Sequence, residues 1–274
     1  MKKYDVKIIA LDLDDTLLKS DLTIGDFTVE ALQKAAKAGI YIVLCSGRTE
    51  DAILPYVRRL DIAGMQTGRY IIAQNGATIY DMHRREVVYS RTVEPDVLTE
   101  AYHAAKAKGL SSEVYTPSTI YAPHDNEWVR LDTELSGLKL GIVEDYENFL
   151  QKGFPKMVIP GKPEELLILQ DELKAHFGER AVIFTSKPYF LEVLPANCGK
   201  GEALKYLAEE VLKIEQGKTM AFGDSMNDES MIKYAAHSTA MLNGLEYIKQ
   251  IAAHVTQFTN DQDGVGRFVA EYVV

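Results

Sequence analysis

Short apolar runs alternate with amphipathic stretches over the first and last parts of the chain. Residues 7–11 include two adjacent isoleucines, residues 40–45 read I-Y-I-V-L-C, and residues 219–222 form a similar run. Apolar runs of this length are typical of strands that are buried on both faces of a parallel sheet. Helical spacing of apolar residues follows the first and the last of these regions, for example over residues 26–37. The pattern predicts an α/β fold with a Rossmann-like parallel-sheet core.

The pattern changes between residues 84 and 194, where short tyrosine-rich strands alternate with helices. The predicted helices there cover residues 95–108, 145–151 and 163–177. The predicted strands cover residues 113–116, 119–122, 157–159, 182–185 and 189–194. We therefore expect a core domain formed by residues 1–83 plus 195–274, with residues 84–194 inserted as a separate α+β domain.

Acidic residues follow the first predicted strand directly. Asp12 and Asp14 are two positions apart, so in extended chain their side chains lean the same way. Two carboxylates at such a short distance repel each other unless a cation or a shared proton separates them. Mg²⁺ is the simplest such cation because it prefers oxygen ligands. The alternative is an ordinary βα loop with solvated aspartates.

A hydroxyl and a glycine, Ser46 and Gly47, follow the strand predicted at residues 40–45 and open a helix. Free backbone N–H groups at such a point suit a phosphate, although a plain serine N-cap has the same appearance. Lys200 lies between Gly199 and Gly201 at the start of another predicted helix. A lysine there can reach an anion together with the N-terminal amides, but it can equally be a solvated surface lysine.

Another polar group, G-D-S-M-N-D at residues 223–228, follows the strand predicted at residues 219–222. Asp224 and Asp228 are four positions apart across a strand-to-helix turn, so both can face one point above the sheet. Because the carboxyl ends of parallel strands share one edge, we expect these acids near Asp12. Stabilisation of the next helix through its dipole is the alternative explanation for Asp228.

These motifs resemble those of the haloacid dehalogenase (HAD) superfamily. D-L-D-D-T at residues 12–16 matches the superfamily's D-x-D-x-T signature, Ser46 and Lys200 match its second and third motifs, and G-D-S-M-N-D matches the fourth motif of the Cof-like, type IIB branch. The resemblance covers the whole chain, and it implies a HAD-like core with an inserted type C2 cap.

The resemblance also implies roles for these residues. Asp12 would be the nucleophile that forms an aspartyl-phosphate, and Asp14 would be the acid/base. The remaining expected positions are phosphate ligands (Ser46, Gly47, Lys200 and Asn227) and Mg²⁺ ligands (Asp12, the Asp14 carbonyl, Asp224 and Asp228).

A phosphatase for small phosphomonoesters is therefore the expected activity. Sugar phosphates rank first as substrates, and cofactor phosphates such as FMN or pyridoxal phosphate are the other candidates. Two alternatives remain open: a sugar phosphomutase on the same core, and a regulator that binds phosphate without catalysis. Neither the natural ester nor the oligomeric state follows from the sequence.

Composition narrows the expected partners. The formal net charge is −10 and the isoelectric point is about 5.2, which argues against a nucleic-acid or anionic-membrane surface. No apolar run approaches the length that spans a bilayer, so the P-type ATPases, which share the aspartyl motif, do not fit. Two cysteines and the absence of a signal-like start indicate a reduced, cytoplasmic protein.

Overall fold

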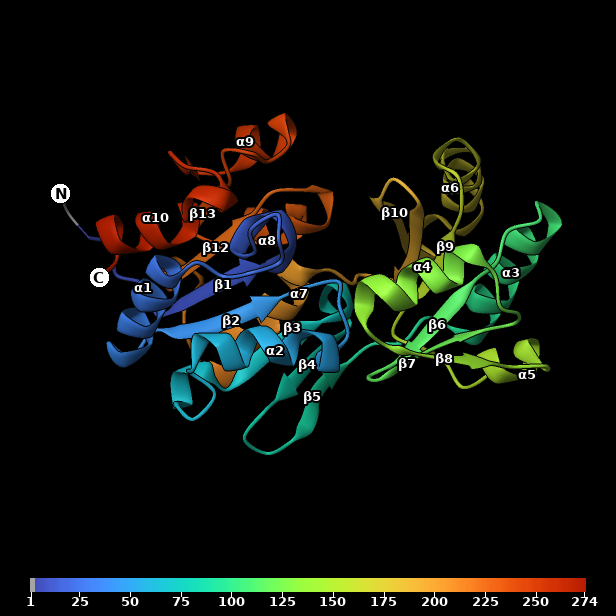
Figure 1. The fold of residues 1–274 in the computed structure, drawn as a ribbon, viewed down its shortest axis with the longest axis horizontal. Coiled ribbons are helices and arrows are strands. Elements are labelled where there is room, and N and C mark those ends of the chain that lie inside the picture. The colour runs from blue at the N-terminus through green and yellow to red at the C-terminus, as the bar shows by residue number, and fades with distance from the viewer. Residues whose placement is uncertain (1–2) are drawn as a thin grey trace. The chain divides into compact units, whose positions relative to one another are not determined.

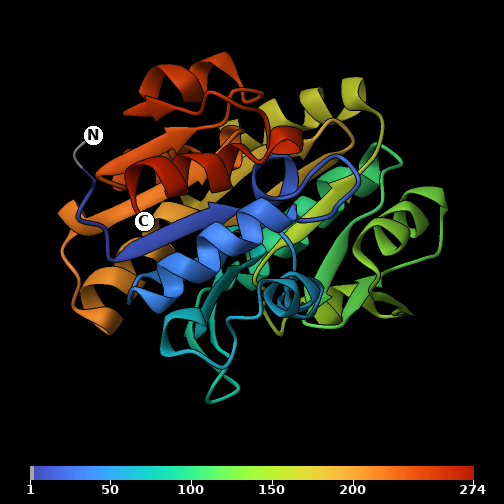
Figure 2. The same cartoon turned by 60° about the vertical axis from the view of Figure 1, so that its left-hand side comes forward.

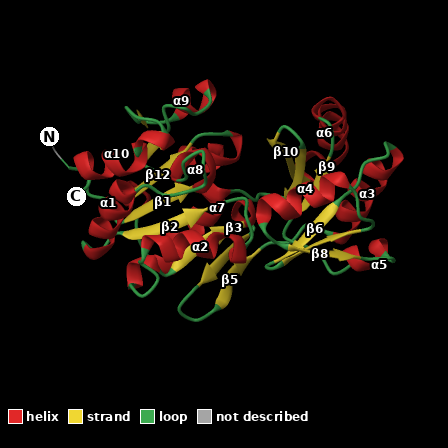
Figure 3. Cartoon of the chain, viewed as in Figure 1, coloured by secondary structure: helices red, strands yellow, loops and turns green. Residues whose placement is uncertain are grey.

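The computed structural model describes residues 3–274, which divide into two compact units. The first unit contains the residues up to Gly47, Ile53–Tyr89 and Gly199–Val274, and the second contains Arg48–Ala52 and Ser90–Cys198. Each unit has a sheet and helices of its own (Figure 3).

The sheet of the first unit has eight strands in the order β14-β13-β12-β1-β2-β3-β4-β5. The strands from β14 to β3 are parallel to their neighbours, and β4 is antiparallel to β3. Their bounds are β1 (Ile8–Asp12), β2 (Tyr41–Cys45), β3 (Tyr70–Ala73), β4 (Thr78–Asp81), β5 (Glu86–Ser90), β12 (Thr219–Gly223), β13 (His237–Ala240) and β14 (His254–Val255). This order confirms the predicted parallel core.

Strand β1 lies inside the sheet, and all five of its residues are buried. Ile9 and Leu11 belong to the apolar cluster on one face, and Ile8 and Ala10 belong to the cluster on the other. Successive side chains of a strand point to opposite faces, so a strand covered on both sides needs an unbroken apolar run. That requirement explains the run that the sequence shows before Asp12.

Helices cover both faces of this sheet (Figure 1). The first apolar cluster takes residues from α1 (Asp26–Lys37), α2 (Glu50–Leu60) and α10 (Gly264–Tyr272), and α1 and α10 run beside each other, blue and red in Figure 2. The second cluster takes residues from α7 (Lys200–Lys205), its continuation Tyr206–Leu212, and α8 (Glu229–Tyr234). Helix α9 (Glu246–Ile251) packs against β13.

The second unit has a six-stranded sheet in the order β10-β11-β9-β6-β7-β8. Neighbouring strands are antiparallel except for β7 and β8. The strands are β6 (Glu113–Thr116), β7 (Thr119–Ala122), β8 (Lys139–Ile142), β9 (Met157–Pro160), β10 (Ala181–Lys187) and β11 (Phe190–Pro195). The helices are α3 (Pro95–Ala107), α4 (Glu127–Ser136), α5 (Tyr146–Leu150) and α6 (Pro163–Phe177). The sequence pattern predicts neither α4 nor β8.

One face of the second sheet carries a buried group of charged side chains. Glu113 and Tyr115 of β6 point to this face, and the Tyr115 hydroxyl donates to Asp132 Oδ2 of α4 over 2.5 Å. Lys156 Nζ lies 3.6 Å from Glu192 Oε2 and 4.5 Å from the centroid of the Tyr115 ring. Burial, followed by the nearby Asp132 carboxylate, raises the pKa of Glu113 well above its usual value.

Glu113→Gln should stabilise the protein in alkaline but not in acidic solution. A raised pKa means that the folded chain keeps a proton that the unfolded chain loses, so stability present at low pH declines as the pH rises. The amide removes that penalty, and we expect a gain in unfolding free energy on the order of 1 kcal/mol at pH 8 and about zero at pH 4. Urea unfolding at both pH values measures it, with Glu179→Gln as the exposed control. Equal effects at both pH values would contradict the expectation.

No helix within residues 3–274 is both long and apolar enough to cross a membrane.

Candidate active site

The predicted functional residues follow the carboxyl ends of three neighbouring strands of the first unit. Asp12 is the last residue of β1, Ser46 follows β2, and Asp224 follows β12. Because β1 lies between β12 and β2 in a parallel arrangement, these three strand ends share one edge. Lys200 begins α7, which packs against α8 on one side of the same sheet.

Lys200 joins two of the predicted acids. Its Nζ lies 2.6 Å from Asp12 Oδ1 and 2.6 Å from Asp228 Oδ1, and all three side chains are buried. Burial opposes the charged form of Lys200, but the two carboxylates outweigh that effect and raise its pKa. The alternative of a solvated surface lysine is therefore wrong, because the Lys200 side chain is 0% exposed.

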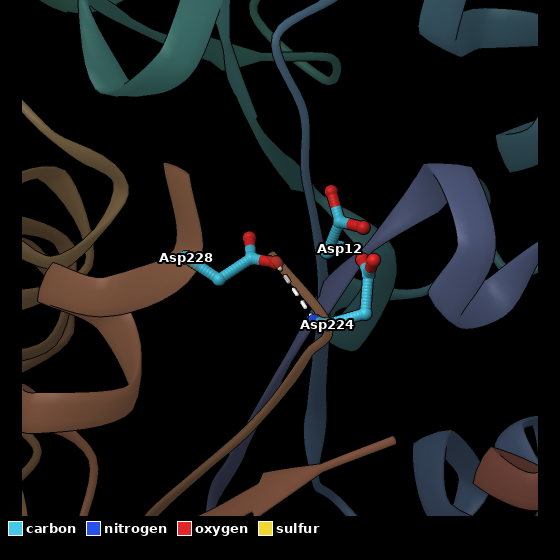
Figure 4. Close-up of side chains that lie close together, drawn as sticks. All are labelled: Asp12, Asp224 and Asp228. Atoms are coloured by element: carbon cyan, nitrogen blue, oxygen red, sulfur yellow. Dashed lines mark hydrogen bonds between the residues drawn. The ribbon is translucent and has the colours of Figure 1, made fainter. Parts of the chain in front are cut away.

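Both carboxylate oxygens of Asp228 accept hydrogen bonds that fix the side chain. Oδ1 accepts from Lys200, and Oδ2 accepts the backbone N–H groups of Asp224 and Ser225 over 2.9 and 3.2 Å. Figure 4 shows the first of these backbone bonds, with Asp228 reaching from the helical side toward Asp224. Ser225 and Asp228 also form a capping box that begins the turn Met226–Asp228. Asp228 therefore both caps the turn before α8 and contacts Lys200.

Asp12, Asp224 and Asp228 form a group that can hold a metal ion. One carboxylate oxygen from each lies within 4.8 Å of the others, and the carboxylates of Asp12 and Asp224 point toward the same space (Figure 4). When all three acids are ionised, Lys200 can balance only one of their negative charges, and buried charge without compensation is costly. An all-oxygen, anionic donor set matches the preference of Mg²⁺. The residues therefore fit such an ion.

Asp12 and Asp224 resist ionisation. Burial, followed by the repulsion of Asp228, raises the pKa of Asp12 well above its usual value despite the Lys200 contact. The same two causes raise the pKa of Asp224 to about 7, although the Thr16 hydroxyl donates to Asp224 Oδ1 over 3.1 Å. A divalent cation would favour the ionised forms and lower both pKa values.

Three of the predicted phosphate ligands, Ser46, Gly47 and Asn227, lie around Asn75. Ser46 is buried, and its backbone N–H donates to Ile72 O of β3 over 2.9 Å. Asn227 Nδ2 donates to Asn75 Oδ1 over 3.1 Å, and a Cβ placed on Gly47 would lie 3.0 Å from Asn75 Nδ2. Gly47 and Asn227 thus contact the same asparagine. Asp14 follows Asp12 by two residues and is partly buried.

Sequence reasoning gave no role to Thr16 or Asn75, both of which contact predicted site residues. Thr16 lies inside the D-L-D-D-T motif, so the sequence could have indicated a role for it. Asn75 belongs to an Asn-Gly pair, which indicated only a turn. Its contact with Asn227 joins positions 152 residues apart, which no local pattern can show.

Comparison with known proteins is consistent with this geometry. The family model for haloacid dehalogenase-like hydrolases matches residues 9–269. A curated relative, the Bacillus subtilis 5-amino-6-(5-phospho-D-ribitylamino)uracil phosphatase YwtE, is 32% identical, and the match covers 96% of this chain and 97% of YwtE.

Solved structures agree over nearly the whole length. A haloacid dehalogenase-like hydrolase from Bacteroides thetaiotaomicron superposes with a TM-score of 0.87 at 30% identity, over 97% of this chain and 99% of the other. The HAD subclass IIB sugar phosphatase BT4131 has the same fold, with a TM-score of 0.82, 23% identity and coverage of 97% and 99%. The predicted resemblance and fold class are thereby confirmed, and the chain belongs to the haloacid dehalogenase-like hydrolase family.

Proposed function

We propose that this chain is a Mg²⁺-dependent phosphatase that hydrolyses small phosphomonoesters through an aspartyl-phosphate on Asp12. One observation carries the proposal: a buried lysine ammonium lies 2.6 Å from Asp12, beside two further acids. Phosphoryl transfer depends mainly on positioning and on charge neutralisation. A carboxylate that is held beside a cationic group suits an attack on a phosphate dianion.

In this proposal Asp12 is the nucleophile and Asp14 is the general acid and base. Ionised Asp12 attacks phosphorus, the bond from phosphorus to the ester oxygen breaks, and Asp14 gives its proton to the departing alkoxide. The aspartyl-phosphate is then attacked by water, whose proton Asp14 takes up. The second step releases inorganic phosphate and regenerates the Asp12 carboxylate, so the enzyme returns to its starting state.

Charged and polar groups of the same site would hold the transferring oxygens. Lys200 contributes its ammonium, Ser46 its hydroxyl, Gly47 its backbone N–H and Asn227 its side-chain amide. Donors that are fixed before the reaction stabilise developing charge at little reorganisation cost. The Ser225 hydroxyl, which donates to Asn227 Oδ1, and the contact with Asn75 hold Asn227 in this way.

Mg²⁺ would be held by the carboxylates of Asp12 and Asp224 and by the Asp14 backbone carbonyl, with Asp228 behind these ligands or bound through water. When bound, the ion supplies positive charge that screens the nucleophile from the substrate phosphate. Since Lys200 already occupies Asp228 Oδ1 and backbone N–H groups occupy Oδ2, we expect the direct contacts to come from Asp12 and Asp224.

The inserted unit, which we expected at residues 84–194, would act as the cap that selects the ester. Sugar phosphates are our first candidates for the substrate, followed by cofactor phosphates such as FMN and pyridoxal phosphate. The name of the relative YwtE, a phosphatase for a phosphorylated ribitylamino-uracil, adds a phosphorylated polyol chain to that range.

Phosphate release from a panel of these esters, with and without Mg²⁺, tests the proposed function. We expect Mg²⁺-dependent release, with a preference for some esters over others. Isomerisation of a sugar phosphate without release would indicate a phosphomutase instead. Stable phosphate binding without turnover of any ester would indicate the regulator and contradict the phosphatase proposal.

Binding of Mg²⁺ should weaken as the pH falls. The pKa of Asp224 is raised to about 7, so below that pH the carboxyl holds a proton that the metal must displace. For one such group, calorimetric affinity should be about tenfold lower at pH 6 than at pH 8. Asp224→Asn should bind Mg²⁺ more weakly and with a smaller pH dependence. Equal wild-type affinity at both pH values would count against Asp224 as a ligand.

A further inference from the structure

The segment Gln74–Gly76, between β3 and β4, has an unusual backbone. Gln74, Asn75 and Gly76 have φ angles of 52°, 55° and 91° in succession. All three residues are buried. Positive φ is costly for residues other than glycine, and such strain persists only where the surroundings hold it in place. A run of three therefore requires an explanation in what the segment contacts.

This segment contacts three separate elements of the candidate active site. The backbone N–H of Asn75 donates to Ser46 O over 2.9 Å, and its side chain packs against Gly47. Asn75 Oδ1 accepts from Asn227 over 3.1 Å. Gly76 lies so close to the residue before Lys200 that an added Cβ would be 2.0 Å from the Gly199 carbonyl oxygen. One strained turn thus contacts three loops that lie far apart in the sequence.

The amide of Asn227 is fixed at both ends. Its Oδ1 accepts the Ser225 hydroxyl over 2.6 Å, and its Nδ2 donates to Asn75. Two opposite bonds determine which end of the amide is nitrogen and which is oxygen. An amide nitrogen carries two N–H donors, so after the bond to Asn75 a second donor remains for an oxygen of a substrate.

We propose that Asn75 is a positioning residue, which orients the Asn227 amide and the Ser46–Gly47 turn toward the transferring phosphoryl group. The inference rests on the proposed phosphatase function and assigns Asn75 no contact with the substrate. Asparagine suits the task because it tolerates positive φ and also supplies a side-chain acceptor. Glycine would share the first property only.

Asn75→Gly tests this proposal because it keeps the backbone conformation and deletes the side chain. Without the Asn75 side chain, the groups that hold the phosphoryl oxygens should be misplaced, and kcat should fall by about 10²-fold. KM should change less than about threefold, because the lost interactions stabilise the transition state more than the bound substrate. Lys213→Gly is the matched control, because Lys213 also has positive φ (56°) but is exposed at a helix end. Thermal unfolding of both variants should stay near that of the wild type.

A double-mutant cycle with Asn227→Ala separates positioning from general structural support. If Asn75 acts through Asn227, the double variant should lose little more activity than the more damaged single variant. Inhibition by orthovanadate with Mg²⁺, which resembles the transition state, should weaken in Asn75→Gly in proportion to the loss of kcat. Full additivity, or wild-type kcat in Asn75→Gly, would overturn the assignment.

Failure of the inference can be told from failure of the proposed function. An active wild type that is silenced by Asp12→Asn but unaffected by Asn75→Gly would refute the role of Asn75 alone. A wild type without turnover would count against the phosphatase. Vanadate binding by calorimetry would then still decide the inference, since wild-type affinity in Asn75→Gly contradicts it.

Discussion

Asp12→Asn should reduce kcat by at least about 1,000-fold, because the amide cannot form the aspartyl-phosphate. The fold should survive the change. Asparagine has the shape of aspartate, and its Oδ1 can still accept from the buried Lys200, which keeps Asp228 as a charged partner 2.6 Å away. Steady-state turnover of p-nitrophenyl phosphate measures the activity, and circular dichroism during heating checks the fold.

The matched control for this variant is Asp15→Asn. Asp15 is three residues away, is exposed, and has a φ of 59° that asparagine tolerates. It should retain nearly all of the wild-type activity. If Asp12→Asn kept more than a tenth of the wild-type kcat, the assignment of the nucleophile would be wrong.

Lys200→Met should abolish activity and also destabilise the protein. Methionine fills a similar volume but leaves Asp12 and Asp228 buried without their shared cation. Breaking a buried ion pair from one side costs about 3–5 kcal/mol of unfolding free energy. The loss should be larger at pH 8 than at pH 5, because Asp12, whose pKa is raised, takes up a proton at low pH and then no longer repels Asp228.

Urea unfolding of Lys200→Met at pH 5 and pH 8 measures this effect, with Lys205→Met in the same helix as the exposed control. Added Mg²⁺ should restore part of the stability of Lys200→Met, since it supplies the missing positive charge. A variant as stable as the wild type at both pH values would show that the lysine does not balance the two acids.

The sequence predicted the elements that have a clear local pattern. The run before Asp12 is apolar at every position because β1 is covered on both sides. Helix α6 was predicted with the bounds Pro163–Phe177 that it has. The placement of Asp12 and Asp224 at one edge followed from the parallel sheet alone. These predictions succeeded because strand burial and edge position depend on short-range pattern and on general topology.

Helix α4 was missed. It buries only Val129 and Asp132 among its residues, so little of it belongs to an apolar core. Its real signals are the Asn126 side chain, which accepts from the N–H groups of Trp128 and Val129, and Gly137 in the left-handed region after its end. Caps of this kind mark a helix independently of amphipathic spacing.

Contacts between distant positions were beyond the sequence pattern. The middle of the chain shows no acidic cluster as a sequence, yet Glu113, Asp132 and Glu192 come from three different elements of the second unit and are all buried in it. Asn75 likewise meets Asn227 only after the sheet has brought β3 near the other strands. Tertiary geometry, and not residue type or spacing, creates both groups.

The central claim is tested most directly by trapping the phosphorylated residue. Asp14→Asn should form the intermediate from p-nitrophenyl phosphate, whose leaving group needs no proton, but should hydrolyse it slowly for lack of the base. After an acid quench, borohydride reduces an acyl phosphate to the alcohol, which can be located by peptide mass spectrometry. We predict homoserine at position 12 and none when Asp12→Asn is added. Mg²⁺-dependent turnover without modification at Asp12, or modification of another acid, would contradict the account.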